Sequence, residues 1–436
     1  MSDKATIRAW AMFDWSNSAY NLVITSTIFP AYYTAITTTD ATGDRVSFFG
    51  FRFINTALAN YSLAFAYLVM ALVLPILSAI ADNRGNKKSF MKGFTYMGGL
   101  ACIGLYFFKL ETLAFGIICS TLAAMGYIGG VLFNNSYLPE IATVDEQDRV
   151  SAQGFAYGYV GSVILQLICF VFVLKPEWFG ISDPTLAPRL SFLLVGLWWI
   201  GFSQIPFRKL PPGKANKKGT STHVLKNGFL ELTIVWRKIQ QLSRLKRFLA
   251  AYFFYAMGVQ TTMLVAAAFG EKILHLGTDK LIITILLIQL VAILGAYLMS
   301  ALATRLENIQ VLAGVVLVWI AVCVSAYAIR TEGQFYALAA VVGLIMGGIQ
   351  SLSRSTYAKF IPEKETDTTS FFSFYDVTEK LAIVIGLFSF AFIEERTENI
   401  RYSALCLALF FVFGLFFLCR LLWKNNQGKD TLKNRI

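Results

Sequence analysis

A polar stripe runs along one face of the first long apolar segment of the chain. Asp14, Ser18, Asn21 and Thr25 follow one another at steps of four, three and four residues, and Asn17 lies beside them. On a helix these positions share a face. An aspartate facing lipid would cost at least about 2.5 kcal/mol, so we expect the stripe to face a bundle interior or a watery cavity. The alternative is that Asp14, about 6 Å from its helix end, reaches water there or caps a neighbouring helix.

Side chains that could complement this stripe occur in a later apolar segment, 334–357. Gly343, Gly347, Gln350 and Arg354 share one helix face in it. The glycines allow close helix approach, and the Arg354 guanidinium offers a forked donor to a carboxylate. The alternative for Arg354 is that it extends to the lipid headgroups. We expect Asp14 to meet Arg354, either directly or through carboxylates of the next segment.

That next segment, 371–393, carries Asp376, Glu379 and Lys380. Asp376 and Lys380 are spaced to pair across one helical turn, which leaves Glu379 to pair elsewhere or to titrate. The sequence therefore predicts a substrate or coupling site of eight residues: Asp14, Asn17, Ser18, Asn21, Gln350, Arg354, Asp376 and Glu379.

No spacing typical of enzyme chemistry accompanies these residues. The six cysteines all fall in apolar segments without a close pair, and the two histidines, His223 and His275, fall in loops. The chain carries no metal-ligand spacing, phosphate-binding loop or nucleophile elbow. We expect no catalytic residue, no metal site and no cofactor. Carboxylates could couple solute movement to protons, and sodium coupling or uniport fits the sequence equally well.

The elements that must position the stripe are long apolar helices. Hydrophobic residues make up 56% of the 436, charged residues only 15%, and the mean hydropathy is +0.59. A soluble protein carries about 25% charged residues. We predict an all-α membrane protein, because twelve segments are long enough to cross a hydrocarbon core of about 30 Å. They lie near 10–37, 58–81, 89–108, 112–135, 151–174, 189–207, 248–270, 281–303, 309–329, 334–357, 371–393 and 402–423. Pro30 allows a kink in the first.

The basic residues indicate the orientation of these spans. With a cytoplasmic N-terminus, the inner segments hold 26 of the 38 lysines and arginines and the outer segments hold 10. Basic loops stay in the cytoplasm, so we expect both termini there. The net charge of +12 is then a signal of topology, and we expect no nucleic-acid partner.

Short matches between the two halves of the chain indicate a parallel repeat. "LSAIAD" (77–82) and "MSALAT" (299–304) are 222 residues apart, and "LPE" (138–140) and "IPE" (361–363) are 223 apart. Two halves of six spans in the same sense place a substrate site at the midplane between them. We therefore predict six-helix bundles at 1–207 and 248–423, a basic linker at 208–247 and a basic cytoplasmic tail at 424–436.

The second part of the linker has the pattern of an amphipathic helix. Leu225, Phe229, Leu232, Trp236 and Ile239 step by three and four residues, with basic residues between them. Such a helix either lies on the cytoplasmic membrane surface or packs against the cytoplasmic ends of the bundle.

The loop between the second and third spans, "ADNRGNKK" (81–88), resembles the signature loop of the major facilitator superfamily. The resemblance implies a gating loop formed by Asp82, Arg84, Gly85, Lys87 and Lys88. Gly85 permits the tight turn, the two lysines are expected to hold the loop in the cytoplasm, and the carboxylate is expected to hold the second and eleventh spans together. One departure is a serine at residue 78, where the superfamily usually has glycine.

Three further stretches narrow the resemblance. "WAMFDWSNSAYN" (10–21), "GGIQSLSRSTYAKFIPE" (347–363) and "FFSFYDVTEK" (371–380) resemble the autophagy-related vacuolar amino-acid effluxers and their bacterial relatives. The resemblance implies a secondary transporter that works by alternating access. The short loops are more similar to the bacterial branch, which implies the bacterial inner membrane.

The expected function is therefore transport of a small organic solute, with amino acids as the leading class because fungal members are associated with amino-acid efflux. Alternatives are another solute class, such as a peptide, a sugar or a drug-like cation, and a non-transporting receptor or scaffold. We expect the solute and membrane lipids as partners, and a monomer.

Overall fold

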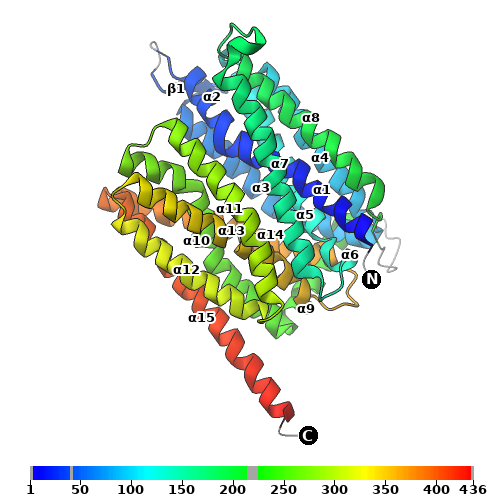
Figure 1. Cartoon of the computed structure of the whole chain (residues 1–436). Coiled ribbons are helices and arrows are strands. Elements are labelled where there is room, and N and C mark those ends of the chain that lie inside the picture. The colour runs from blue at the N-terminus through cyan, green and yellow to red at the C-terminus, as the bar shows by residue number, and fades with distance from the viewer. Residues whose placement is uncertain (1–2, 40–42, 214–223, 434–436) are drawn as a thin grey trace. The chain divides into compact units, whose positions relative to one another are not determined.

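The computed structural model describes residues 3–39, 43–213 and 224–433, which are mostly helical (Figure 1). They form two compact units, and the division passes through two helices, α7 (Gln147–Leu174) and α9 (Val224–Gln241). Unit 1 comprises residues 1–137 and 157–230, and unit 2 comprises residues 138–156 and 231–436. The predicted boundaries of the two bundles assign 138–156 to the first bundle, whereas these residues group with unit 2.

Unit 1 begins with a helical stretch in three parts. They are α1 (Lys4–Ala19), a π-helical segment η1 (Tyr20–Thr27) and α2 (Ile28–Thr37). Asp3 caps α1 by accepting hydrogen bonds from the backbone N–H groups of Ala5 and Thr6. The remaining elements are β1 (Arg45–Phe48), β2 (Phe51–Ile54), α3 (Asn55–Arg84), α4 (Lys87–Gly104), the short turns η2 (Leu105–Phe107) and η3 (Leu110–Thr112), α5 (Leu113–Asn135), the larger part of α7, η4 (Pro176–Phe179) and α8 (Leu186–Lys209).

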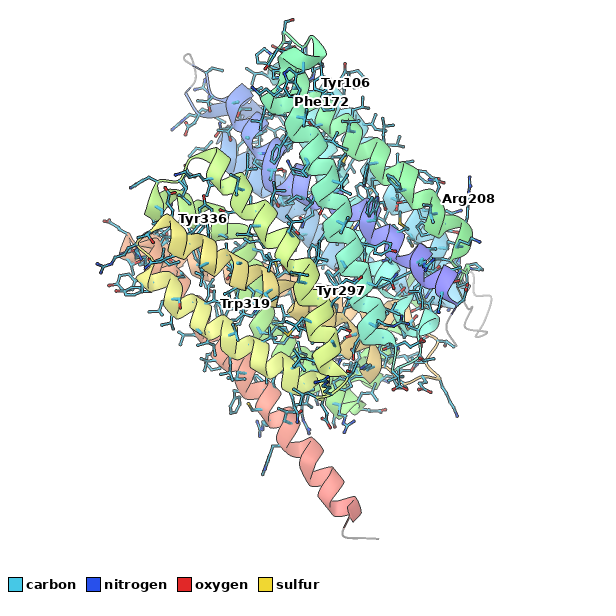
Figure 2. All side chains as sticks on the ribbon, viewed as in Figure 1. Tyr106, Phe172, Arg208, Tyr297, Trp319 and Tyr336 are labelled. Carbon is cyan, nitrogen blue, oxygen red and sulfur yellow. The ribbon has the colours of Figure 1, made fainter. Side chains whose placement is uncertain are left out.

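The helices of unit 1 pack in a bundle around α4, α5 and α8. Helix α4 packs on α5 and on α8, while α3 packs on α5 and α1 packs on α8. The strands β1 and β2 form an antiparallel hairpin in the loop after α2, with Val46 opposite Phe53. Figure 2 shows Tyr106 and Phe172 near one end of this unit and Arg208 near the C-terminal end of α8.

Unit 2 contains α6 (Leu138–Ile141), the start of α7, the second part of α9, and then six long helices. These are α10 (Ser243–Leu274), α11 (Thr278–Ala303), α12 (Asn308–Ala328), α13 (Glu332–Phe360), α14 (Thr368–Thr397) and α15 (Ile400–Lys433). Helix α11 lies along α13, and α15 packs on α10 and α12 (Figure 1). The predicted tail continues α15 as a helix to Lys433.

Nine helices or runs of helices in the described ranges are long and apolar enough to cross a membrane. Each coincides with a predicted span. The other three predicted spans fall on helical residues 4–37, 87–104 and 368–397, where polar and charged side chains interrupt the apolar pattern. The all-α membrane fold is confirmed, and the number of twelve crossings stays a prediction.

The irregularity in the first span differs from the kink expected at Pro30. Residues Tyr20–Thr27 form the π-helical segment, and Thr27 has φ −131° and ψ −79°. Pro30 lies in the first turn of α2, where the missing N–H has no intrahelical acceptor to lose. A π-helical turn inside an α-helix is often found at functional sites.

Candidate functional site

The polar stripe on α1 is buried in unit 1 against α5 and α7. Asp14 is 8% exposed, and its Oδ1 accepts a hydrogen bond of 3.1 Å from Asn134 Nδ2 on α5. Asn17 is 2% exposed. A Cβ added at Gly158 on α7 would lie 2.5 Å from Ser18 Oγ, so the two helices touch there. These three polar residues therefore face helices of the bundle.

The π-helical segment places two more polar residues of the first span. Asn21 is half-buried, and its backbone carbonyl accepts a hydrogen bond from Ser26 Oγ. Thr27 Oγ1 lies within hydrogen-bond distance of two acceptors, Leu22 O at 2.8 Å and Gln166 Oε1 on α7 at 2.7 Å. A π-helical turn leaves carbonyl groups without their usual α-helical donors, and these hydroxyls supply donors to two of them.

Aromatic side chains that the sequence reasoning missed line the same part of unit 1. Trp15 stacks on Trp198 of α8 with ring centroids 5.6 Å apart, and Trp198 Nε1 donates to the Trp15 carbonyl at 3.3 Å. The centroid of the Tyr20 ring lies 5.2 Å from that of Tyr127 and 5.6 Å from that of Trp199. The aromatic residues are visible in the sequence, but only the fold shows that they gather around the stripe.

Arg354 is buried in unit 2, at 3% exposure, and its guanidinium contacts the first turns of α7. Its Nε donates to Ser151 Oγ at 3.0 Å and its Nη2 donates to Ser151 O at 2.8 Å. The guanidinium carbon lies 4.2 Å from the centroid of the Phe155 ring. The guanidinium does not extend to the surface of the unit. Asp14 belongs to unit 1, and its pairing with Arg354 stays a prediction.

The other predicted residues of α13 show why this face carries glycine. A Cβ added at Gly347 would lie 2.0 Å from the Ala292 carbonyl oxygen on α11, and one at Gly343 would lie 2.6 Å from a carbonyl oxygen of the same helix. The close helix approach expected from these glycines is confirmed. Gln350 is half-buried, with its Nε2 3.4 Å from Met263 Sδ.

The carboxylates of α14 form a buried charged cluster around Lys380. Lys380 Nζ lies 3.2 Å from Asp376 Oδ1 and 2.9 Å from Glu379 Oε2. Glu379 Oε1 also accepts hydrogen bonds from Tyr252 OH at 3.0 Å and from Gln260 Nε2 at 2.6 Å, both on α10. The spacing of Asp376 and Lys380 predicted their pair, and Glu379, which was expected to pair or to titrate, pairs with the same lysine.

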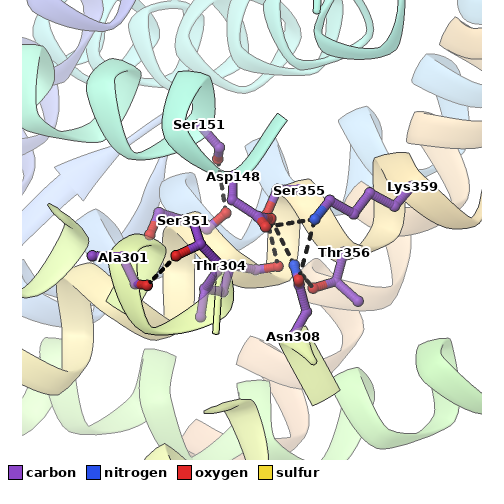
Figure 3. Close-up of polar contacts among 10 residues, drawn as sticks. Asp148, Ser151, Ala301, Thr304, Asn308, Ser351, Ser355, Thr356 and Lys359 are labelled. Atoms are coloured by element: carbon purple, nitrogen blue, oxygen red, sulfur yellow. Dashed lines mark hydrogen bonds and ion pairs between the residues drawn. The ribbon is translucent and has the colours of Figure 1, made fainter. Parts of the chain in front are cut away.

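A second polar network in unit 2 was not predicted (Figure 3). Asp148, in the first turn of α7, accepts from Asn308 Nδ2 at 2.6 Å through Oδ1 and pairs with Lys359 Nζ at 2.5 Å through Oδ2. Lys359 also donates to Asn308 Oδ1 at 3.2 Å. Ser151 Oγ donates to Ser351 O at 2.7 Å. The network joins residues that are about 50 to 210 positions apart in the sequence. The one sequence signal for it is a lysine, Lys359, within the stretch "TYAKFIPE".

The signature loop adopts the turn that its glycine predicts. Gly85 has φ +65° and ends α3, with its N–H donating to Ala81 O. Asp82 is buried at 5% exposure, whereas Arg84 is exposed. The role of Asp82 between the second and eleventh spans stays a prediction.

The lysines of this loop do not simply extend into solvent. Lys87 is 2% exposed, donates to Ser136 O at 3.3 Å and lies over the Tyr137 ring at 4.0 Å. Lys88 Nζ donates to Leu210 O at 2.6 Å. Both lysines therefore tie the start of α4 to neighbouring backbone within unit 1.

The second part of α9 packs on unit 2. Of the two alternatives for the linker helix, this is the one in which it packs against the bundle. Trp236 lies 5.5 Å from the Phe374 ring, and Lys238 Nζ lies 2.8 Å from both Glu365 and Asp367. Burial lowers the pKa of Lys238, but the hydrogen bonds to the two carboxylates outweigh it and the pKa is raised overall. The side chains of Leu225, Phe229 and Leu232 lie outside the described residues.

The described ranges contain no group of three or more His, Cys, Asp and Glu side chains arranged to hold a metal ion. All six cysteines are free thiols, and four of them are buried, whereas Cys419 is exposed. The buried polar groups of the two units are carboxylates, amides and basic side chains. Such groups can bind a polar solute or an ion.

Comparisons with known proteins agree with this architecture. The family model of the vacuole effluxer Atg22-like proteins matches residues 2–432. The chain is 31% identical over 412 residues to the uncharacterized MFS-type transporter YxiO of Bacillus subtilis, covering 94% of this chain and 93% of that protein. It is 26% identical over 396 residues to autophagy-related protein 22 of Eremothecium gossypii, covering 83% of this chain and 76% of that protein.

Solved structures with a similar fold are also transporters. The fucose:proton symporter of E. coli has a TM-score of 0.72 at 13% identity, with 97% of this chain and 99% of that chain covered. The proton:xylose symporter XylE has a TM-score of 0.70 at 10% identity, with 95% of each chain covered. At these identities the likeness shows the fold alone. The family model, which matches nearly the whole length, and the 31% identical MFS-type transporter show that the chain belongs to the Atg22-like family of major facilitator superfamily transporters.

Proposed function

We propose that this chain is a secondary active transporter that moves a small organic solute, with amino acids as the leading class, by alternating access. The observation that carries the proposal is the burial of charged and amide side chains inside apolar helices of both units. Asp14, Arg354 and Asp376 are each less than a tenth exposed. Ionisable groups within membrane helices are expensive, and proteins place them where solutes or ions bind.

The amino-acid class rests on the resemblance of residues 10–21, 347–363 and 371–380 to the vacuolar amino-acid effluxers. One relative carries the name autophagy-related protein 22, and the family model describes vacuole effluxers. A zwitterionic solute needs both acceptors and donors in its site. Buried carboxylates and amides occur in unit 1 and a buried guanidinium occurs in unit 2, which supports a solute of mixed charge.

The remaining features of the proposal follow from transport. The chain acts as a carrier and not as an enzyme, as a monomer in the bacterial inner membrane with both termini in the cytoplasm. Its partners are the solute and membrane lipids, and nucleic acid is not among them. Protons or sodium supply the driving force. A receptor or scaffold of the same fold is the rival, and it has no need for charged residues inside its helices.

Reconstituted protein tests the proposal. Purified chain in proteoliposomes preloaded with unlabelled solute is given radiolabelled amino acids, dipeptides, sugars or a lipophilic cation, and exchange is measured against empty liposomes. We expect saturable exchange of at least one amino acid. Exchange confined to another panel member would replace the amino-acid class, and absence of exchange for every solute would favour the receptor or scaffold.

A further inference from the structure

We propose that Asp14, Asn17 and Asn134 form a binding site for a sodium ion between α1 and α5 in unit 1. The inference deepens the proposed function and rests on it, because the bound ion would be the one whose gradient drives transport. It concerns two buried amide oxygens near Asp14, one on Asn17 of the stripe and one on Asn134 of α5.

Asn134 faces Asp14 across the helix pair, and Asn17 lies one turn further along α1, opposite Gly130. Asp14 and Asn17 are one turn apart on α1, while Gly130 and Asn134 are one turn apart on α5. Asn134 Nδ2 lies 3.1 Å from Asp14 Oδ1. A Cβ added at Gly130 would lie 3.7 Å from Asn17 Oδ1. Asn134 is therefore opposite Asp14, and Gly130 is opposite Asn17.

Two oxygens of this group are buried without a hydrogen-bond donor. Asn17 is 2% exposed and Asn134 is 0% exposed, and the Oδ1 of each has no hydrogen-bond partner within the described ranges. A buried acceptor with no donor is costly, and a cation that accepts both oxygens as ligands removes that cost.

The chemistry of the ligands favours a hard monovalent cation. Carboxylate and amide oxygens are the ligands that such cations prefer. One carboxylate balances one positive charge, whereas a divalent ion would remain net positive in a low-dielectric interior. The near-complete burial of all three side chains admits a bare ion more readily than the ammonium group of a solute, which brings its carbon skeleton with it.

Sodium binding can be measured without transport. The melting temperature of the detergent-purified protein is followed in NaCl, KCl and choline chloride at one ionic strength. A ligand that binds only the folded state stabilises it by mass action. We expect a saturable increase of about 2–4 °C in 100 mM NaCl over 100 mM KCl.

Variants connect the response to the three residues. Asp14→Asn should abolish the sodium-specific increase, and Asn17→Ala, which keeps the charge, should shift its midpoint to higher sodium concentration. Asp183→Asn is the matched control, because it removes one carboxylate from an exposed loop of the same unit and should leave the response unchanged. Should Asp14→Asn fail to fold, Asn134→Ala and binding of radioactive sodium to the wild-type protein replace it.

The outcomes separate this inference from the proposed function. Equal melting temperatures in NaCl and KCl would overturn the sodium site and leave the oxygens to an ordered water, as would a response to pH alone, which would assign the site to a proton. A full sodium response in both Asp14→Asn and Asn17→Ala would also overturn it. A sodium response in a protein that exchanges no solute would support the site and count against the transport proposal.

Discussion

At the scale of single residues, the most consequential feature is that three buried charges have specific partners within their own unit. Asp14 is held by Asn134, Arg354 by Ser151, and Lys380 by two carboxylates. Removing one member of a buried pair leaves the other uncompensated, which typically costs about 3–5 kcal/mol. These contacts can therefore bias a conformational equilibrium whose gap is a few kcal/mol.

The pair Asp148–Lys359 tests directly how much free energy is lost when one member of a buried pair is removed. We expect Asp148→Asn and Lys359→Met each to destabilise the protein by about 3 kcal/mol, near the lower end for a buried pair, because Lys359 keeps some exposure. The double variant should lose less than the two losses together. The melting temperature reports the losses. Lys175→Met, in an exposed pair with Glu177, is the control and should cost less than about 1 kcal/mol. Additive losses would show that the two residues act independently.

Residue types and pairs within one helix were predictable from the sequence, whereas partners on other helices were not. The spacing of Asp376 and Lys380 on one helix gave their pair directly, because both positions follow from helical periodicity. Ser151 as the partner of Arg354 lies 203 positions away, and no local pattern connects the two. Asp148 was missed for the same reason, since its partners come from α12 and α13.

At the scale of helices, glycine decides how closely two elements pack. The backbone of α11 fills the space where a side chain at Gly347 would lie. We expect Gly347→Ala to lower the melting temperature by several degrees, because the backbone can yield only by moving one helix, at a cost of about 1–3 kcal/mol.

Gly314, in the middle of α12, is the matched control for this substitution. No atom lies within 4 Å of a Cβ added there. Gly314→Ala should leave the melting temperature unchanged or raise it, since alanine is the better helix former by about 1 kcal/mol. A similar loss in both variants would mean that helix packing is not the cause.

The helices were predictable because their apolar stretches are long enough to cross a membrane. Their irregularities were not, because they depend on contacts with other helices. Nine predicted spans coincide with helices long enough to cross a membrane. The π-helical segment has no sequence signal of its own, because it depends on bonds such as Thr27 to Gln166 on another helix. The placement of 138–156 in unit 2 likewise depends on contacts of α7 with α13.

At the scale of the whole molecule, the uneven distribution of lysine and arginine predicts the orientation in the membrane. We expect a cysteine at Arg208, the exposed C-terminal end of α8, to react with an impermeant maleimide only from the cytoplasm, in a background free of native cysteines. A cysteine at Trp178, in the exposed loop after α7, should react only from outside. Both labels are read in intact cells and in inverted vesicles. The reverse pattern would overturn the orientation.

Solute flux tests most directly the proposal that buried polar residues of each unit take part in transport. Amino-acid exchange in proteoliposomes is compared for the wild type, Asp14→Asn, Arg354→Ala, the double variant and the exposed-loop control Asp183→Asn. We predict wild-type flux for the control, strongly impaired flux for each of the other single variants, and a loss in the double variant that is less than additive because both residues act on one interaction. Wild-type flux in Asp14→Asn, or full additivity of the two losses, would contradict the account.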